Sequence, residues 1–235
     1  MSLKQVTLLF TLALASLLAV AQTPTSYAGL DDTPGWQSCT KPCAGGNGTA
    51  QFSMTEGIGS PSQDGASAQF TLGGSTGYSN ALWWLHVANN AAASNFTFDT
   101  YQYLDNPQAP QAVEYSTTQY YSGKWYKFST QCSYAKGIWR VWDTYDKRWV
   151  ATTAPCVRQA ANTWSHLTLQ YQRANGRAVF VAITVDGQTW YINKSFRPAS
   201  ASGTSGNITI HYQLDGNKTQ TKFNAYLDEL QLTVW

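Results

Sequence analysis

One stretch of the chain, residues 162–193, constrains the fold more than any other part of the sequence. It reads NTWSHLTLQYQRANGRAVFVAITVDGQTWYIN. Apolar and polar residues alternate through its first part, which is typical of a half-buried strand because successive side chains point to opposite faces. Asn175-Gly176 and Asp186-Gly187 interrupt the pattern, and both pairs favour the positive φ angles of a type I′ turn. The stretch therefore predicts a three-stranded antiparallel meander.

Similar short segments occur along the rest of the chain, separated by turn residues. We expect strands at residues 51–54, 67–72, 82–87, 95–104, 112–118, 124–131, 138–144, 149–152, 208–213 and 225–234. No helical periodicity of useful length follows the first twenty residues. Short strands with regular turn signals predict an all-β, antiparallel sandwich or barrel.

The first 21 residues have the pattern of a secretory signal peptide. Lys4 precedes an apolar run at residues 6–20, and Ala19-Val20-Ala21 is a small-x-small cleavage site. The run is too short for a comfortable membrane span. We therefore expect a secreted protein, extracellular or periplasmic, that is cleaved near Ala21. A short leader at residues 22–35 would precede a single domain at residues 36–235.

Composition narrows the range of partners. Charged residues make up 12% of the chain, with a formal net charge of +2, against about 25% charged residues in an ordinary soluble domain. There is no basic run or acidic tail, so we expect no nucleic acid or membrane surface as a partner. Aromatic residues reach 14%, including ten Trp, and part of this excess predicts a stacking surface. We expect the protein to be a monomer.

Four cysteines lie beyond the signal peptide: Cys39, Cys43, Cys132 and Cys156. In an oxidising compartment this even number predicts two disulfides, for which three pairings exist. We favour Cys39–Cys43 and Cys132–Cys156, because each pair brackets one local excursion of the chain. Unequal spacing and the lack of a nearby His argue against a zinc site.

Several elements resemble the concanavalin A-like lectin and glucanase superfamily, in which laminin-G-like domains are also found. These elements are Trp164-x-His166, Val185-Asp186-Gly187 and the last strand Tyr226-Leu227-Asp228-Glu229-Leu230. The resemblance implies a jelly-roll sandwich of two curved sheets, one of them concave and open to ligand.

The segment Ala112-Val113-Glu114-Tyr115 also resembles the metal-binding strand of legume-type lectins. Those lectins carry an acidic ligand two residues beyond the matching Glu, where this chain has Ser116. The loss of a charged oxygen disfavours Ca²⁺ or Mn²⁺. We therefore expect no cofactor and no double-metal site, and leave open a single structural Ca²⁺ near Asp31-Asp32 or Asp64.

Alternation places aromatic rings and polar groups on one face of the segments between residues 82 and 144, and apolar residues on the other. A sugar stacks its ring on Trp or Tyr while its hydroxyls need directional partners, so the mixed face predicts carbohydrate binding. The expected stacking rings are Trp84, Tyr101, Tyr103, Trp125 and Trp142. The expected hydrogen-bonding groups are His86, Glu114, Gln131 and Arg140. The alternative is an ordinary solvated sheet.

Three functions follow from these patterns. We favour a non-catalytic, lectin-like protein that binds polysaccharide. The first alternative is a glycosidase, which needs two carboxyl groups, with Glu114 paired to Asp99 or Glu229, although the Glu-x-Asp-x-x-Glu run of related glucanases is absent. A polysaccharide lyase that neutralises a uronate with Lys127 or Arg140 belongs to the same class. The last alternative is a structural or adhesive extracellular domain.

Overall fold

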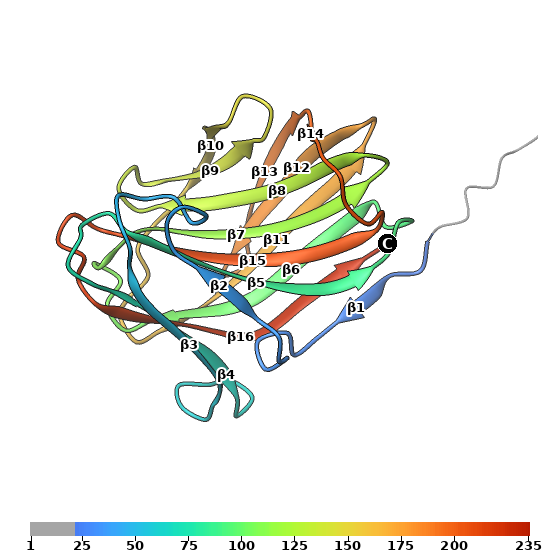
Figure 1. Ribbon diagram of the computed structural model, residues 1–235. Coiled ribbons are helices and arrows are strands. Elements are labelled where there is room, and N and C mark those ends of the chain that lie inside the picture. The colour runs from blue at the N-terminus through green and yellow to red at the C-terminus, as the bar shows by residue number, and fades with distance from the viewer. Residues whose placement is uncertain (1–21) are drawn as a thin grey trace, which may run out of the picture.

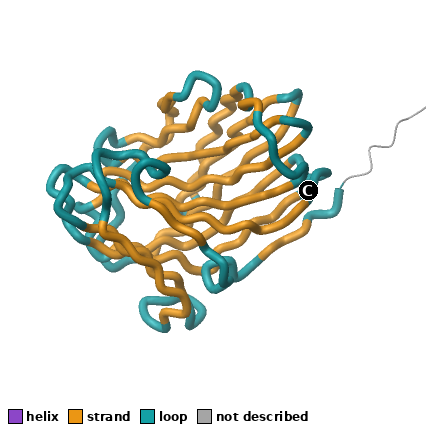
Figure 2. The backbone as a smooth tube through the Cα atoms, viewed as in Figure 1, coloured by secondary structure: helices purple, strands orange, loops and turns teal. Residues whose placement is uncertain are grey.

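The computed structural model describes residues 22–235, so the expected signal peptide lies outside the described residues. These residues form sixteen strands and no helix (Figures 1 and 2). The strands are β1 (Thr25–Tyr27), β2 (Gln37–Cys39), β3 (Gln51–Ile58), β4 (Ser67–Gly73), β5 (Asn80–Asn89), β6 (Asn95–Leu104), β7 (Pro110–Tyr121), β8 (Lys124–Ser133), β9 (Ile138–Asp143), β10 (Arg148–Pro155), β11 (Trp164–Ala174), β12 (Arg177–Val185), β13 (Gln188–Phe196), β14 (Ala199–Ser200), β15 (Asn207–Gly216) and β16 (Phe223–Val234).

Every strand expected from the sequence coincides with an observed one, and three short strands were not foreseen: β1, β2 and β14. Loops and turns lie at the ends of the strands (Figure 2). Between residues 22 and 235 there is no helix of the length and apolarity that a membrane span requires.

The strands form two antiparallel sheets that stack as layers (Figure 1). The meander sheet has the order β13-β12-β11-β6-β16-β4-β3, with β1 added beside β16. The β7 sheet has the order β10-β9-β8-β7-β15-β5-β2, with β14 added beside β8. The all-β, antiparallel two-sheet sandwich is confirmed.

The predicted meander is observed as β11, β12 and β13. Asn175 and Gly176 have φ angles of 50° and 68°, and Asp186 and Gly187 have φ angles of 48° and 81°. Positive φ at both central residues is what a type I′ turn requires, and its twist matches that of the flanking strands. The two turns therefore set the register of one half of the meander sheet.

The core lies between the two sheets and is rich in aromatic rings. The ring of Phe70 in β4 meets Trp83 at a centroid distance of 5.2 Å and Tyr212 at 4.8 Å, both edge-to-face. Phe96 and Phe128 join the two sheets at another point, 5.3 Å apart. Edge-to-face rings suit the aromatic quadrupole and add to the free energy gained by burial. Part of the high aromatic content is therefore structural.

The segment expected as a leader, residues 22–35, packs onto the sandwich. β1 pairs with β16, Thr25 opposite Val234, and Leu30 is buried in the core. Disulfides join Cys39 to Cys43 and Cys132 to Cys156, which confirms the favoured pairing. Two disulfides are typical of proteins from an oxidising compartment.

Candidate functional site

The outer face of the β7 sheet, which points away from the meander sheet, carries most of the predicted binding residues. Register places Gln213, Glu114, Gln131 and Arg140 in one row across β15, β7, β8 and β9. A neighbouring row contains Trp84, His211, Ser116 and Ser129. Ser116, Ser129 and Gln131 are at most 5% exposed although they point outward. These central side chains are therefore covered by the side chains around them.

Gln131 links the groups at the centre of the face. Its Nε2 donates to Glu114 Oε1 at 2.6 Å and to Asp215 Oδ2 at 3.0 Å. Its Oε1 accepts a hydrogen bond from Arg140. Gln213 Nε2 donates to the other oxygen of Asp215 at 2.8 Å. Two carboxyl groups and a guanidinium are thus held in one connected network.

The Glu114 and Asp215 carboxyl groups lie close together, because both accept hydrogen bonds from Gln131 Nε2. Burial is the main cause that raises the pKa of both Glu114 and Asp215. The hydrogen bond between them lowers the pKa of Glu114 and raises that of Asp215. Both carboxyl groups are therefore harder to ionise here than in water. Two carboxylates this close cannot both ionise easily, because like charges disfavour each other.

His211 lies in the adjacent row and is neutral. Burial is the larger cause and the charge of Lys127 the smaller one that together lower its pKa to about 3. Its Nε2 lies 3.3 Å from Thr118 Oγ1. A hydroxyl pair, Ser116 and Ser129 at 2.6 Å, completes this part of the floor. These neutral groups both donate and accept hydrogen bonds, and they form the floor beneath the more exposed side chains.

Aromatic rings and two cations form one side of the face, over β8, β9 and β10. Lys127 Nζ lies 5.5 Å from the ring centroid of Trp125 and 5.7 Å from that of Trp142. Trp142 and Trp149 meet edge-to-face at 5.2 Å. The guanidinium of Arg140 lies 5.6 Å from the Trp149 ring. Half-buried rings next to hydrogen-bonding groups are what sugar binding requires.

The structure brings together seven of the nine predicted binding residues and separates the other two. The seven on the β7 sheet are Trp84, His86, Glu114, Trp125, Gln131, Arg140 and Trp142. Tyr101 and Tyr103 belong to β6 in the meander sheet, so their placement on the same face is wrong. There Tyr101 stacks on His166 at 4.6 Å, and Tyr103 packs against Trp164.

The expected partners of Glu114 are also wrong. Asp99 in β6 and Glu229 in β16 both belong to the meander sheet. Asp99 accepts hydrogen bonds from His166 and Thr168 there. The carboxyl group beside Glu114 is that of Asp215 in β15. Asp215 could not be assigned to this face from the sequence, because the assignment needs the strand order.

Two further residues of the face were missed. His211 alternates with buried Ile210 and Tyr212 in β15, so the sequence could predict that it points outward. The residues that surround it could not be predicted without the strand order. Trp149 pairs with Trp142 across the β9–β10 hairpin. The Trp142–Trp149 pair could have been predicted from the sequence. Asp146-Lys147 indicates a turn, and the resulting hairpin sets the two rings opposite each other.

No metal site is evident among residues 22–235, where no three His, Cys, Asp or Glu side chains gather as a ligand group. Asp31 is 1% exposed and accepts the backbone N–H of Leu230 at 2.9 Å. Asp64 accepts the backbone N–H of Ala66 at 3.1 Å. A single structural Ca²⁺ near these residues stays a prediction, and so does the absence of a cofactor.

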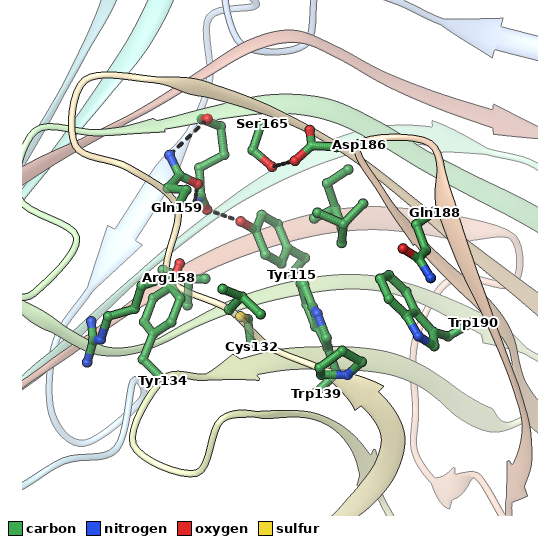
Figure 3. Close-up of a pocket in the computed structure, with 16 residues that line it drawn as sticks. Tyr115, Cys132, Tyr134, Trp139, Arg158, Gln159, Ser165, Asp186, Gln188 and Trp190 are labelled. Carbon is green, nitrogen blue, oxygen red and sulfur yellow. Dashed lines mark hydrogen bonds between the residues drawn. The ribbon is translucent and has the colours of Figure 1, made fainter.

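A cavity of about 430 Å³ lies between the two sheets, away from the candidate face (Figure 3). Trp139, Trp190 and Val185 contribute to its apolar walls. Its polar groups bond largely to one another: Gln102 accepts from the hydroxyl of Tyr115 and donates to Gln159 at 3.2 Å. None of the nine predicted residues lines it, so the cavity is separate from the candidate site.

The sequence matches no known family and no curated protein. Among solved structures, the protein titled "Cellulose induced protein, Cip1" is similar with a TM-score of 0.51 and 9% identity, over 84% of this chain and 90% of that chain. The chain has the concanavalin A-like sandwich fold. At this identity the similarity establishes the fold alone.

Two more matches are the carbohydrate recognition domain of Emp47p and a carbohydrate-binding module of the β-sandwich superfamily. The first has a TM-score of 0.45 and 11% identity, over 86% of this chain and 89% of that chain. The second has the same TM-score and identity, over 86% of this chain. The chain spans 58% of that second chain and 16% of a sialidase that is also similar.

Proposed function

We propose that this protein is a secreted, non-catalytic carbohydrate-binding protein that holds a polysaccharide on the outer face of the β7 sheet. The observation that carries the proposal is a group of three rings, Trp125, Trp142 and Trp149. These rings lie beside the hydrogen-bond network of Gln131 and Glu114. The rings offer flat apolar surfaces for stacking, and the network offers fixed donors and acceptors. The two disulfides support a location outside the reducing cytosol.

The test compares two ring deletions on opposite faces. Binding to a panel of soluble plant and microbial polysaccharides would be measured by affinity electrophoresis and calorimetry. Trp142→Ala should weaken binding about tenfold, which is the loss expected of a central aromatic anchor. Tyr103→Ala removes a ring from the outer face of the meander sheet and should leave binding unchanged. A folded protein that binds nothing in the panel, or equal losses in both variants, would contradict the proposal.

One observation favours an enzyme as the second candidate, namely the close carboxyl pair of Glu114 and Asp215, in which burial raises both pKa values. Raised carboxyl pKa values cluster at catalytic sites. A hydrolase, however, keeps its two carboxyl groups about 5 Å or more apart, so that the scissile bond fits between them. Here the two groups bond to each other and to the same nitrogen of Gln131. The geometry therefore supports binding over hydrolysis.

A further inference from the structure

We propose that the ligand of this face is an acidic polysaccharide built of uronate sugars, whose carboxylates bind Lys127 and Arg140. The inference rests on the proposed function, because it names the class of sugar that the same face would take. It follows from the two cations, from the charges that surround them and from the rings between them.

Lys127 presents an ammonium group that lies beside two rings and has no acidic group within ion-pair distance among residues 22–235. The two rings that its Nζ faces are Trp125 and Trp142. Burial lowers its pKa, while Glu114 acts in the opposite direction. A poorly solvated ammonium group is costly unless it is paired. A carboxylate from a ligand would supply the missing partner.

Arg140 carries an incompletely satisfied guanidinium on the same side of the face. One terminal nitrogen donates to Gln131, and the guanidinium lies over the ring of Trp149. Its Nε is buried and has no hydrogen-bond partner among residues 22–235. A guanidinium fork matches the two oxygens of a carboxylate, which is why Arg is common where carboxylates are bound. Since Nε itself is closed to solvent, a ligand carboxylate would bind the terminal nitrogens of this incompletely satisfied guanidinium.

The remaining titratable groups of the face do not neutralise the two cations. Burial raises the pKa of both Glu114 and Asp215, and their closeness disfavours ionisation of both at once. His211 is neutral because of its burial. The imidazole of His86, at the exposed edge in β5, is bonded to Asn207 at 3.1 Å and adds no acid. The two cations thus face a carboxyl pair that resists full ionisation, which favours an anionic ligand.

The two cations flank a pair of rings. Lys127 lies over Trp142, Arg140 lies over Trp149, and these two rings touch. A sugar stacked on the rings would therefore have a cation on each side. This arrangement fits a polymer that repeats both a flat pyranose ring and a carboxylate. A neutral glucan has no carboxylate that could bind the two cations.

The experiment measures affinity for three uronate polymers, polygalacturonate, alginate and hyaluronate, and for the same polymers after chemical reduction of their carboxyl groups. Lys127→Gln and Arg140→Gln should each weaken binding to the preferred uronate polymer about tenfold or more, as expected for loss of a hydrogen bond to a charged group. Arg140→Lys keeps the charge but loses the fork and should fall between. Lys194→Gln on β13 removes the same charge from the other sheet and should have no effect.

The outcomes separate this inference from the proposed function. Carboxyl reduction should abolish the preference, and added salt should weaken binding to the acidic polymer more than to its reduced form. Binding of a neutral glucan that depends on Trp142, with no preference for any uronate polymer, would overturn the inference and leave the proposed function intact. Failure to bind any polysaccharide would overturn both. Thermal unfolding of each variant shows whether a loss comes from misfolding.

Discussion

Gln131 forms hydrogen bonds with both acidic and basic groups at the centre of the candidate site. Its amide donates to Glu114 and Asp215 and accepts from Arg140. Only an amide side chain offers both donors and an acceptor without a charge of its own. A carboxylate at this position would set a third acid beside the first two, and a cation would remove the acceptor that Arg140 uses. One neutral residue therefore holds acidic and basic groups in fixed positions.

Gln102 performs a similar role between the sheets, and its loss should be measurable. Its Oε1 accepts hydrogen bonds from the buried hydroxyls of Tyr115 and Tyr212, the latter at 3.4 Å. Gln102→Leu would leave both hydroxyls without this partner, so we expect the free energy of unfolding to fall by about 1–3 kcal/mol. Urea unfolding measures the change. Gln170→Leu, at an exposed position of β11, is the control and should change it by less than about 0.5 kcal/mol. Equal effects would contradict the role of Gln102.

Asp31 should make the stability of the fold depend on pH. Burial is the main cause that raises its pKa to about 7, with smaller contributions from Asp32 and Asp228 against the hydrogen bond from Leu230. Between about pH 4 and pH 7 the unfolded chain has lost this proton while the folded chain retains it. The stabilisation that Asp31 gives the fold is therefore complete at low pH and is lost as the pH rises through 7. The free energy of unfolding falls by at most about 1.4 kcal/mol per pH unit over this range.

Asp31→Asn should remove this part of the pH dependence. Urea midpoints from pH 4 to pH 8, measured with a chelator present, should fall less steeply in the variant than in the parent protein. Asp146→Asn, in the turn between β9 and β10, should reproduce the parent profile. Parallel profiles for all three proteins would show that Asp31 ionises normally in the fold.

At the scale of elements, the turns of the meander are the most testable feature. Gly176 has a φ of +68° and no atom within 4 Å of an added Cβ, so a side chain there meets backbone strain but no steric clash. Gly176→Ala should destabilise the fold by about 1 kcal/mol. Gly59→Ala is the matched control, because Gly59 has no positive φ and its added Cβ meets only Gly65 O at 3.8 Å. If both variants have the parent's melting temperature, the turn does not limit stability.

Strands were predictable because alternation and turn residues act locally. The strands and turns of the meander could be predicted, because Asn-Gly and Asp-Gly each indicate a type I′ turn. The register shifts between Gln170 and Tyr171 and between Phe180 and Ala182 could not be predicted. The order of strands in the sheets could not be derived. β6 pairs with β11 and β16, and β7 pairs with β15, and these partners are far apart in sequence. Alternation shows which residues of a strand share a face, but not which sheet receives the strand.

For the whole molecule, this limit explains the errors in the predicted site. Tyr101 and Tyr103 alternate with buried residues in the same way as Trp125 and Trp142 do, yet β6 and β8 belong to different sheets. The same limit concealed Asp215 as the partner of Glu114. A sandwich has two outer faces, and both carry aromatic rings here. On the outer face of the β7 sheet, the rings lie together with two cations and a buried carboxyl pair.

The geometry of that pair predicts that the face binds polysaccharide without cleaving it. Hydrolysis needs an acid and a base or nucleophile on separate sides of the sugar bond, whereas Glu114 and Asp215 act as one hydrogen-bonded unit. His211 is neutral but shielded, so it is poorly placed to take a proton from a bound sugar. Long incubation with each polymer should therefore release no reducing ends and no unsaturated products. Glu114→Gln should change affinity alone. Product release that Glu114→Gln abolishes would reverse this conclusion and make the pair catalytic.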